Sequence, residues 1–450
     1  MSFPKYDRYK DSGVEWLEEV PEHWKAGALK HFVVSKPGAI KTGPFGSQLT
    51  SVEMQEGKIK VYNQRNVIDA DFSSGDNYIT EMKFLSLLGF ETFPGDLLVT
   101  TRGTIGRAAI LPANAERGIL HPCVLRIQPD ELKLNTHFLE ILIQDSDLLK
   151  IQLDYLSNAT TIDVIYSETM ASVILPVPPL PEQRSIATFL DRETTKIDEL
   201  IAEQQQLIDL LKEKRQAVIS HAVTKGLNPD APMKDSAIEW LGEVPEHWEV
   251  GHIKRLTTKI TDGSHISPET ENGVYAFIST KDVKNDSLDF DNCLRTSVEN
   301  YEYLVRTGCK PIAGDVLFSK DGTIGRTVVI KEDRDFVVAS SLIIISPDQN
   351  ILFPFFLNYL CQSSTIVSQV ECFVKGAGLP RLSIQNLLRI VGVFPPLPEQ
   401  RSIAAFLDRE TAKFDELIAE THHAIALLRE RRTALISAAV TGKIDVRSLV

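Results

Sequence analysis

Two stretches of this 450-residue chain place mostly apolar residues at every seventh position. In residues 178–226 the repeat runs through Leu190, Ile197, Gln204, Leu211 and Val218. In residues 395–443 it runs through Leu407, Phe414, Thr421, Leu428 and Leu435. A flanking row adds Ile201 and Ile208 to the first stretch, and Ile418 and Ile425 to the second. A sevenfold apolar repeat predicts α-helices that pair through a coiled-coil seam.

Each predicted helix has a start and a stop signal. Pro181 and Pro398 suit the first helical position, and Gly226 and Gly442 follow the last periodic residues. About 40 helical residues span roughly 60 Å at 1.5 Å per residue, which is longer than a domain of about 150 residues. We therefore expect the helices to pair with each other in antiparallel fashion, rather than each to pack on its own domain.

The two stretches are copies of one another. They align without a gap, and both begin PPLPEQRSIA. A second repeat precedes each of them, DSGVEWLEEVPEHW at 11–24 and DSAIEWLGEVPEHW at 235–248. Two homologous halves related by a pseudo-twofold axis would bring the seams face to face. Gln204 and Thr421 are then equivalent polar seam residues, which either fix the register or are simply tolerated.

The segments between the repeats have diverged. Residues 25–176 and 249–393 alternate short apolar runs with turn residues, as in GDLLVTTRGTIGRAAILP at 95–112 and GDVLFSKDGTIGRTVVIK at 314–331. This pattern predicts strands joined by tight turns, with helices interspersed. We expect two α+β domains, each with a twisted, mostly antiparallel sheet. The shared GTIGR turn (103–107 and 322–326) either approaches a phosphate backbone or is a structural hairpin kept from the duplication.

The expected organisation is therefore a pseudo-twofold duplication, with two globular domains separated by a pair of long antiparallel helices. The predicted parts follow in chain order: a lead segment (1–24), a first domain (25–176), a central helix (177–226), a linker with a second lead segment (227–248), a second domain (249–393) and a C-terminal helix (394–450). Each lead segment carries two tryptophans, Trp16 and Trp24 or Trp240 and Trp248. We favour a core role, in which they attach the lead segment to its domain and the helix ends; the alternative is a partner-binding hot spot.

Composition narrows the choice of function. The net charge of −13 argues against a generic binder of polyanions, although a local basic face is compatible with it. No apolar run is long enough to span a membrane and no signal pattern opens the chain, so we expect a cytoplasmic protein without a membrane partner. The five cysteines form no C-x-x-C pair, so neither a zinc site nor a disulfide framework is expected, and no metal ligands are predicted.

Catalytic motifs are missing from the sequence. It contains no [N/D]-P-P-[F/Y] tetrad, no G-x-G-x-x-G after a strand and no G-x-x-x-x-G-K-[ST] loop. The PDELK run at 129–133 crowds its carboxylates together instead of spreading them over two strands, so it makes a poor nuclease site. We therefore predict no catalytic residue and no cofactor in this chain.

The PPLPEQR segments before both helices, the WL-x-E-V-P-E-H-W segments, the GPFGS turn (43–47), the TDGSH turn (261–265) and the two GTIGR hairpins together resemble the DNA specificity subunit of type I restriction–modification enzymes. The resemblance covers essentially the whole chain, in the expected order. It implies two target recognition domains, each of which reads one part of a split, asymmetric sequence in double-stranded DNA. It also implies that the helices fix the gap between these parts and dock two adenine-methyltransferase subunits, to which motor–nuclease subunits are added. S-adenosylmethionine, ATP and Mg would then belong to the partner subunits.

Candidate DNA contacts are polar or basic side chains on predicted turns, because such groups read base edges and bind phosphates. In the first domain they are Lys41, Thr42, Phe45, Ser47, Gln48, Gln64, Arg65, Asn66, Arg102 and Arg107. In the second they are Asp262, Ser264, His265, Thr280, Lys281, Lys320, Arg326, Lys375 and Arg381. Two other functions stay open: a coiled-coil scaffold that never touches DNA, and a stand-alone nuclease or methyltransferase.

Overall fold

The structure, a computed structural model, describes residues 3–156, 164–266, 273–284, 287–374 and 381–449. The chain folds as two compact units, Met1–Glu203 with Ala424–Val450 (unit 1) and Gln204–His423 (unit 2). Both boundaries fall inside long helices, α6 (Leu180–Lys225, 46 residues) and α11 (Leu397–Val440, 44 residues). Each unit therefore contains a part of both helices. Among the described residues, no helix is long and apolar enough to cross a membrane.

The two long helices begin and end where the sequence predicts. Pro181 and Pro398 lie in the first turns, and Gly226 and Gly442 follow the helices with φ of +77° and +76°, a conformation that glycine adopts without strain. A single α6 of 46 residues corresponds to about 69 Å of helix at 1.5 Å per residue.

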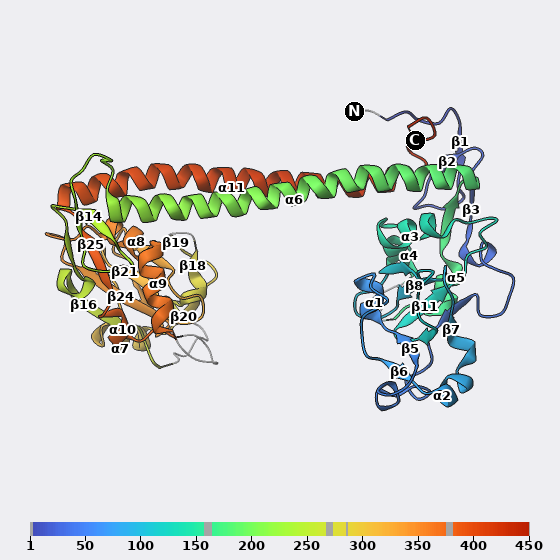
Figure 1. Cartoon of the computed structure of the whole chain (residues 1–450), viewed down its shortest axis with the longest axis horizontal. Coiled ribbons are helices and arrows are strands. Elements are labelled where there is room, and N and C mark those ends of the chain that lie inside the picture. The colour runs from blue at the N-terminus through green and yellow to red at the C-terminus, as the bar shows by residue number, and fades with distance from the viewer. Residues whose placement is uncertain (1–2, 157–163, 267–272, 285–286, 375–380, 450) are drawn as a thin grey trace. The chain divides into compact units, whose positions relative to one another are not determined.

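The helices pair in antiparallel fashion, as predicted (Figure 1). In unit 1, Leu190 and Ile197 near the start of α6 share an apolar core with Leu435 near the end of α11. In unit 2, Ile219 near the end of α6 shares a core with Leu407 near the start of α11. Burial of apolar side chains along this seam is the main force that joins the helices.

Equivalent ion pairs flank the seam in the two units. Arg432 Nε lies 3.0 Å from Asp198 Oδ1 in unit 1, and Arg215 Nε lies 3.1 Å from Asp415 Oδ1 in unit 2. Arg432 and Arg215 occupy the same position of the repeated helix sequence, and so do Asp198 and Asp415. The pairing thus follows the pseudo-twofold symmetry expected from the duplication.

The predicted seam residues lie on the covered side of the helices. Six are buried: Leu190, Ile197, Leu407, Phe414, Thr421 and Leu435. Four are half-buried: Gln204, Leu211, Val218 and Leu428. Thr421 donates its hydroxyl to Leu417 O of its own helix at 2.7 Å, so this buried polar group is satisfied without a partner across the seam.

Unit 1 contains two four-stranded sheets, which share a core. One sheet has the order β4-β11-β8-β9 and is antiparallel, and the other has the order β6-β5-β10-β7, with β5 and β10 parallel. Leu97 and Val99 face the core that contains the long helices, whereas Leu98 faces the core shared with the second sheet, as the alternation along a strand requires. The strands of unit 1 are β1 (Tyr9–Asp11), β2 (Glu19–Pro21), β3 (Lys25–Ala28), β4 (Ile40–Thr42), β5 (Ile59–Tyr62), β6 (Tyr78–Ile79), β7 (Glu91–Thr92), β8 (Leu97–Thr100), β9 (Ala108–Ile110), β10 (Gly118–Leu120), β11 (Val124–Ile127) and β12 (Ile174–Val177). Its shorter helices are α1 (Gln64–Ile68), α2 (Glu81–Ser86), α3 (Thr136–Gln144), α4 (Leu148–Leu156) and α5 (Ser167–Ser172), with 3-10 turns η1 (Leu29–His31), η2 (Val52–Met54) and η3 (Leu88–Phe90).

Unit 2 repeats this plan with different side chains. Its two larger sheets have the orders β16-β24-β21-β22 and β20-β17-β23, with β17 and β23 parallel. The strands are β13 (Met233–Asp235), β14 (Glu243–Pro245), β15 (Glu249–His252), β16 (Thr257–Asp262), β17 (Tyr275–Ile278), β18 (Val283–Lys284), β19 (Ser287–Leu288), β20 (Leu294–Thr296), β21 (Val316–Ser319), β22 (Thr327–Val329), β23 (Phe336–Val338), β24 (Leu342–Pro347) and β25 (Val391–Phe394). The helices are α7 (Val298–Arg306), α8 (Pro354–Gln362), α9 (Ser364–Phe373) and α10 (Ile384–Leu387), with η4 (Ile253–Leu256) and η5 (Thr280–Asp282). The α+β prediction, with mostly antiparallel strands, is confirmed in both units.

The Gln of each PPLPEQR segment attaches a long helix to the adjacent domain. Gln183 accepts a hydrogen bond from Asn135 N (2.8 Å) and donates to Lys133 O (3.0 Å). Its copy Gln400 does the same with Phe353 N (2.7 Å) and Ile351 O (2.8 Å). Because both glutamines are fully buried, these bonds form in a site of low dielectric, where leaving them unmade is costly.

The Glu of the same segment binds the lead segment. Glu182 accepts hydrogen bonds from the Tyr6 hydroxyl (2.5 Å) and Trp24 Nε1 (3.0 Å), and pairs with His23 (2.7 Å). In unit 2, Glu399 pairs with His247 at 2.8 Å.

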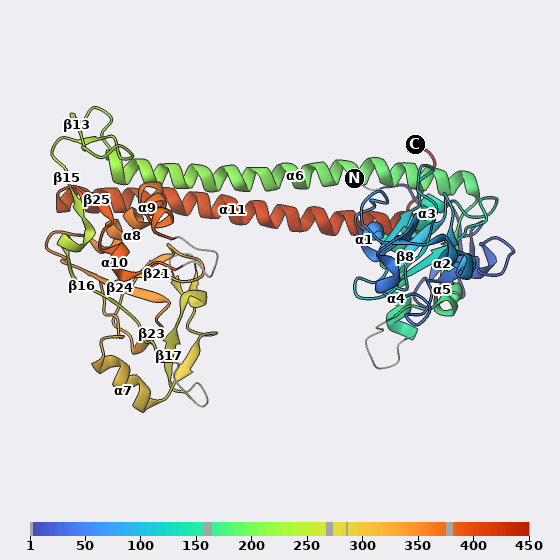
Figure 2. The same ribbon diagram turned by 60° about the horizontal axis from the view of Figure 1, so that its bottom comes forward.

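The two ends of the chain meet in unit 1, where Asp445 N donates to Pro4 O at 2.8 Å (Figure 2).

The tryptophans of the lead segments divide into two kinds. Trp24 and Trp248 are fully buried in the cores that include the helix ends, so the core role is confirmed for them. Trp16 is half-buried against the core of unit 1. Trp240 is exposed, so the core prediction is wrong for this residue.

Candidate nucleic-acid interface

Three loops of unit 1 meet at one end of its two large sheets. They are residues 43–48 after β4, 63–66 after β5 and 101–107 between β8 and β9. The segment 121–124 joins them through backbone hydrogen bonds: Gly43 N to Val124 O (2.8 Å), Thr101 N to Cys123 O (3.0 Å) and His121 N to Tyr62 O (3.0 Å). We call these four segments the first strand-end cluster. They bring together predicted residues that lie up to 62 positions apart in the sequence (Phe45 to Arg107, 107 − 45).

Several side chains of the first cluster face solvent. Phe45 is 72% exposed, and the Arg65 side chain is 86% exposed. Arg102 and Arg107 are also exposed, and neither forms an ion pair with any residue that the structure describes. Cations that are held near backbone turns but left unneutralised are suited to contact phosphate oxygens. Ser47 and Gln48 lie on the same exposed loop, where Gln48 accepts a hydrogen bond from Phe45 N.

Other predicted residues of this domain are used inside the fold. The Thr42 hydroxyl lies 2.7 Å from the Ser167 hydroxyl, and Lys41 Nζ lies 4.6 Å from the centre of the Phe90 ring. Asn66 is only 2% exposed. Its amide donates to two backbone carbonyls and accepts from Asn63 N. Gln64 is half-buried and donates to Arg102 O at 2.7 Å, which ties α1 to the GTIGR hairpin.

Unit 2 builds an equivalent cluster from residues 263–266, 279–282, 320–326 and 339–342. The same backbone bonds recur: Gly263 N to Leu342 O (3.1 Å), Lys320 N to Ser341 O (2.9 Å) and Ala339 N to Ile278 O (2.8 Å). We call this the second strand-end cluster. Both GTIGR turns are hairpin turns, with positive φ at Gly103 and Gly106 and at Gly322 and Gly325.

Several basic side chains at the second cluster are paired with carboxylates. His265 Nε2 lies 2.7 Å from Asp262 Oδ2, and Arg381 Nε lies 3.0 Å from Asp321 Oδ1. Lys320 is buried between the two carboxylates, 3.7 Å from Asp262 and 3.6 Å from Asp321. Arg65 of the first cluster is paired in the same way, with its Nε 3.0 Å from Asp69 Oδ2, whereas Arg102 and Arg107 are not paired with any residue that the structure describes.

Of the remaining predicted residues of unit 2, some form hydrogen bonds inside the fold and others are exposed at the surface. Ser264 is buried and donates to Ile266 O (2.9 Å), and Thr280 donates to Ser341 O (3.1 Å). Lys281 is exposed, and Arg326 is exposed with one guanidinium nitrogen donating to Val283 O at 3.2 Å. Lys375 lies outside the described residues.

One glycine in each cluster is dictated by backbone contact. A Cβ on Gly43 would lie 2.0 Å from His121 O, and a Cβ on Gly263 would lie 2.2 Å from Val338 O. Neither position can therefore accept a side chain without moving the segment that joins the loops. Both glycines belong to turns that the sequence singles out, GPFGS and TDGSH.

Sequence reasoning missed the residues that hold the clusters together. Ser341 accepts from Thr280 N through its hydroxyl (3.1 Å), and burial lowers the pKa of His121, which keeps this imidazole neutral at physiological pH. Residues 63–66 and 279–282, which we call the tips of the two clusters, are each closed by a capping box, Asn63 with Asn66 and Ser279 with Asp282. In each pair the two polar residues are three positions apart, and this spacing in the sequence could have predicted the capping boxes.

The described residues contain no group of three or more His, Cys, Asp and Glu side chains that could hold a metal ion. The two clusters instead combine protruding loops, cations, amides and hydroxyls on matched frameworks. Such a set suits hydrogen bonding to phosphates and to base edges.

Residues 47–210 and 245–426 match the model of a protein family described as the type I restriction modification DNA specificity domain. The chain belongs to this family. The resemblance expected from the repeated motifs is thereby confirmed, and the chain is a specificity subunit of a type I restriction–modification system. The two matches fall on the two halves of the duplication, and each contains most of one strand-end cluster.

Curated relatives and solved structures agree with the family. The specificity subunit of the type I restriction enzyme EcoBI from Escherichia coli is 24% identical over 373 residues, 80% of this chain and 76% of its own length. The putative type I restriction enzyme MjaX specificity subunit from Methanocaldococcus jannaschii is 23% identical over 466 aligned positions, 100% of this chain and 99% of its own length. A chain from a structure on complex assembly and conformational transition of the type I R-M system superposes with a TM-score of 0.68 at 17% identity, over 94% of this chain and 98% of that one. This superposition supports the fold.

Proposed function

We propose that each strand-end cluster reads one half of a two-part, asymmetric sequence in double-stranded DNA. The observation that carries the proposal is the contrast between the clusters. Their backbone hydrogen bonds are equivalent, yet the exposed side chains differ: Phe45, Arg65, Arg102 and Arg107 in the first, and His265, Lys281 and Arg326 in the second, where Arg381 also pairs with Asp321. Base identity is read by the side chains that reach the groove. Two domains with the same backbone framework but different exposed side chains are therefore suited to recognise two different half-sites.

The long helices would set the unread gap between the half-sites. Each helix is continuous through both units, and each pairs with the other in both units. Half-sites about one helical turn of DNA apart, roughly 34–36 Å, present the same face of the duplex. Adding residues to both helices should therefore lengthen the gap between the two methylated parts.

Two methyltransferase subunits would dock on the helices at equivalent places. Leu200 and Leu417 are exposed copies of one another, and so are Leu210 and Leu427. Unit 1 contains Leu200 and Leu427, whereas unit 2 contains Leu210 and Leu417, so each unit offers one leucine of each kind. Repeated exposed apolar side chains on a helical surface are typical of a binding site for a partner, and two equivalent sites suit two copies of one partner.

The chemistry would reside in the partners. The sequence lacks the motifs of methyltransferases and nucleotide-binding motors, which supports a chain that recognises DNA without catalysing a reaction. S-adenosylmethionine would bind to the methyltransferase subunits, and ATP and Mg to the motor–nuclease subunits.

Methylation mapping tests this proposal. The chain and its genomic methyltransferase are expressed together in a host without adenine methylation, and the modified sites are mapped genome-wide. We expect a two-part, non-palindromic motif with a fixed gap, which disappears when this chain is omitted. A stable complex that leaves DNA unmodified and shows no salt-dependent DNA binding would instead support the scaffold function.

A further inference from the structure

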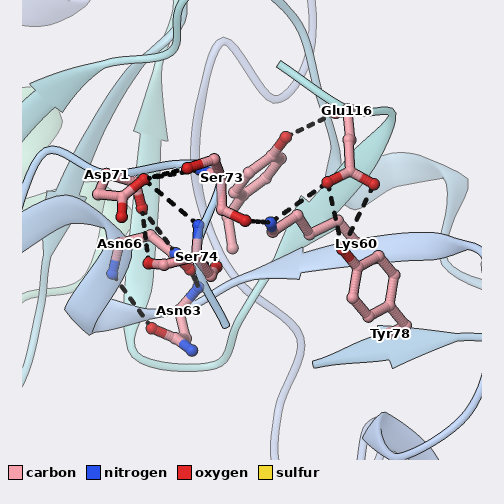
Figure 3. Close-up of polar contacts among 9 residues, drawn as sticks. Lys60, Asn63, Asn66, Asp71, Ser73, Ser74, Tyr78 and Glu116 are labelled. Atoms are coloured by element: carbon pink, nitrogen blue, oxygen red, sulfur yellow. Dashed lines mark hydrogen bonds and ion pairs between the residues drawn. The ribbon is translucent and has the colours of Figure 1, made fainter. Parts of the chain in front are cut away.

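A buried lysine lies directly behind the reading tip of the first cluster. Lys60 is on β5, and its side chain is only 1% exposed. Its ammonium donates to Ser73 O at 2.9 Å and lies 3.3 Å from Glu116 Oε1 and 5.6 Å from the centre of the Tyr78 ring (Figure 3). Burying an ammonium group is costly, so this charge is kept only where such partners compensate it.

The carbonyl group that Lys60 binds belongs to Ser73, in the loop of residues 71–74 that follows α1 in the chain. Asp71 Oδ1 accepts from Ser73 N (3.0 Å), the Ser73 hydroxyl (2.6 Å) and Ser74 N (3.3 Å). These bonds give the loop one shape, and Lys60 fixes that shape to strand β5.

The same loop holds the tip. Asn66 Nδ2 donates to Asp71 O and Ser74 O, both at 2.9 Å, and Asn66 Oδ1 accepts from Asn63 N at 3.0 Å. Asn63 in turn accepts from Arg65 N at 2.8 Å. A continuous set of bonds therefore leads from Lys60 through the loop and Asn66 to the backbone that carries Gln64 and Arg65.

The second domain closes its tip without such a lysine. The strand register places Ala276 where the first domain has Lys60, since both lie two residues before the strand end that precedes the tip. Its capping pair, Ser279 and Asp282, is present, and Asp282 O accepts from Asp289 N at 2.8 Å. A buried lysine at this strand position is thus found in the first domain and not in the second, whose buried Lys320 lies on another segment of its cluster.

We propose that Lys60 is a positioning residue for DNA recognition by the first domain. It acts through the 71–74 loop and Asn66, which orient α1 so that Arg65 meets its base. This inference rests on the proposed function, because it assumes that the first cluster reads one half-site.

The test variant is Lys60→Met, which removes the ammonium charge and keeps an unbranched side chain. Glu116 is half-exposed and can be solvated when its partner is lost, so the domain should still fold. Lys58→Met is the matched control, because it removes one exposed lysine from the residues just before the same strand. Both variants are expressed as full chains with the methyltransferase, and binding is measured on cognate DNA and on DNA mismatched in one half-site at a time.

We expect Lys60→Met to lower discrimination against mismatches about tenfold in one half-site and to leave the other half-site unchanged. Lys58→Met should match the wild type. In an Arg65→Ala background, Lys60→Met should have no further effect, because the side chain through which it acts is gone.

Unchanged discrimination at both half-sites would overturn the role of Lys60 while the proposed function stands. Equal losses at both half-sites, or a full effect in the Arg65→Ala background, would show that Lys60 has only a general structural role and would also overturn the proposal. A wild-type complex that recognises no two-part sequence would overturn the proposed function, and this inference with it.

Discussion

Removing the carboxylate of Glu182 should loosen the lead segment of unit 1 far more than removing Glu399 loosens that of unit 2. Glu182 is 6% exposed and accepts from the buried Tyr6 hydroxyl and Trp24 Nε1. Glu182→Ala would leave both donors buried and unpaired, at a cost of about 1–3 kcal/mol each. We therefore expect about 3 kcal/mol of local destabilisation.

Glu399→Ala provides the matched control. The Glu399 side chain is 32% exposed, and its bond to His247 lies at the surface. Trp248 Nε1 has no hydrogen-bond partner among the described residues even with Glu399 in place, so nothing buried loses a partner there. The expected cost is under about 1 kcal/mol, as for other exposed pairs.

Hydrogen exchange measured by mass spectrometry separates the two lead segments, because each gives its own peptides. Glu182→Ala should raise the opening equilibrium of residues 4–24 about 100-fold, which corresponds to about 3 kcal/mol. Glu399→Ala should change residues 228–248 less than about fivefold. Equal effects at the two places, or no effect of Glu182→Ala, would refute the reasoning that unpaired buried donors decide this contact.

Three further predictions follow from the charges and exposed residues. If Arg102 and Arg107 contact phosphates, replacing both by alanine should make the slope of log affinity against log salt shallower by about 1.8, measured by titration on cognate and scrambled DNA; an unchanged slope would remove them from the interface. The pKa of His137 is raised to about 9 by its hydrogen bonds to Glu140 and Asp191, so its contribution to stability is present in full below about pH 6.5 and is lost as the pH rises through 9. Because this site is partly exposed, the effect should be about 1 kcal/mol or less, seen as a fall in melting temperature between pH 6.5 and 9.5 that is absent in His137→Gln. Finally, Leu200→Glu with Leu427→Glu should reduce the number of bound methyltransferase subunits from two to one in sedimentation analysis, whereas Leu85→Glu, at an exposed leucine of α2, should leave two.

Local signals in the sequence were sufficient for the long helices and the hairpins. The heptad row from Leu190 to Val218 predicts both the helix and its buried side, and the glycines of GTIGR predict the turn. These features depend on neighbours within a few residues, so periodicity and turn chemistry describe them well.

The site was harder to predict because burial depends on contacts between distant segments. Lys320 has the chemistry of a DNA contact, yet it is buried against Asp262, which comes from the end of β16. The residues next to Lys60 in the sequence do not indicate that its ammonium group is buried against Ser73 and Glu116. Gly43 lies in the GPFGS turn, which the sequence singles out. Why this position must be glycine, the close approach of His121 O, is seen only in the folded backbone.

The central claim is that each strand-end cluster reads its own half of the target. Arg65 and Lys281 occupy equivalent, exposed positions of the two tips, so they allow a matched comparison. Methylated sites should be mapped for Arg65→Ala and for Lys281→Ala, each as the full chain with its methyltransferase. We predict that Arg65→Ala relaxes base preference in one half of the motif only, and that Lys281→Ala relaxes the other half only. Relaxation of the same half by both variants, or of both halves by either one, would contradict the account.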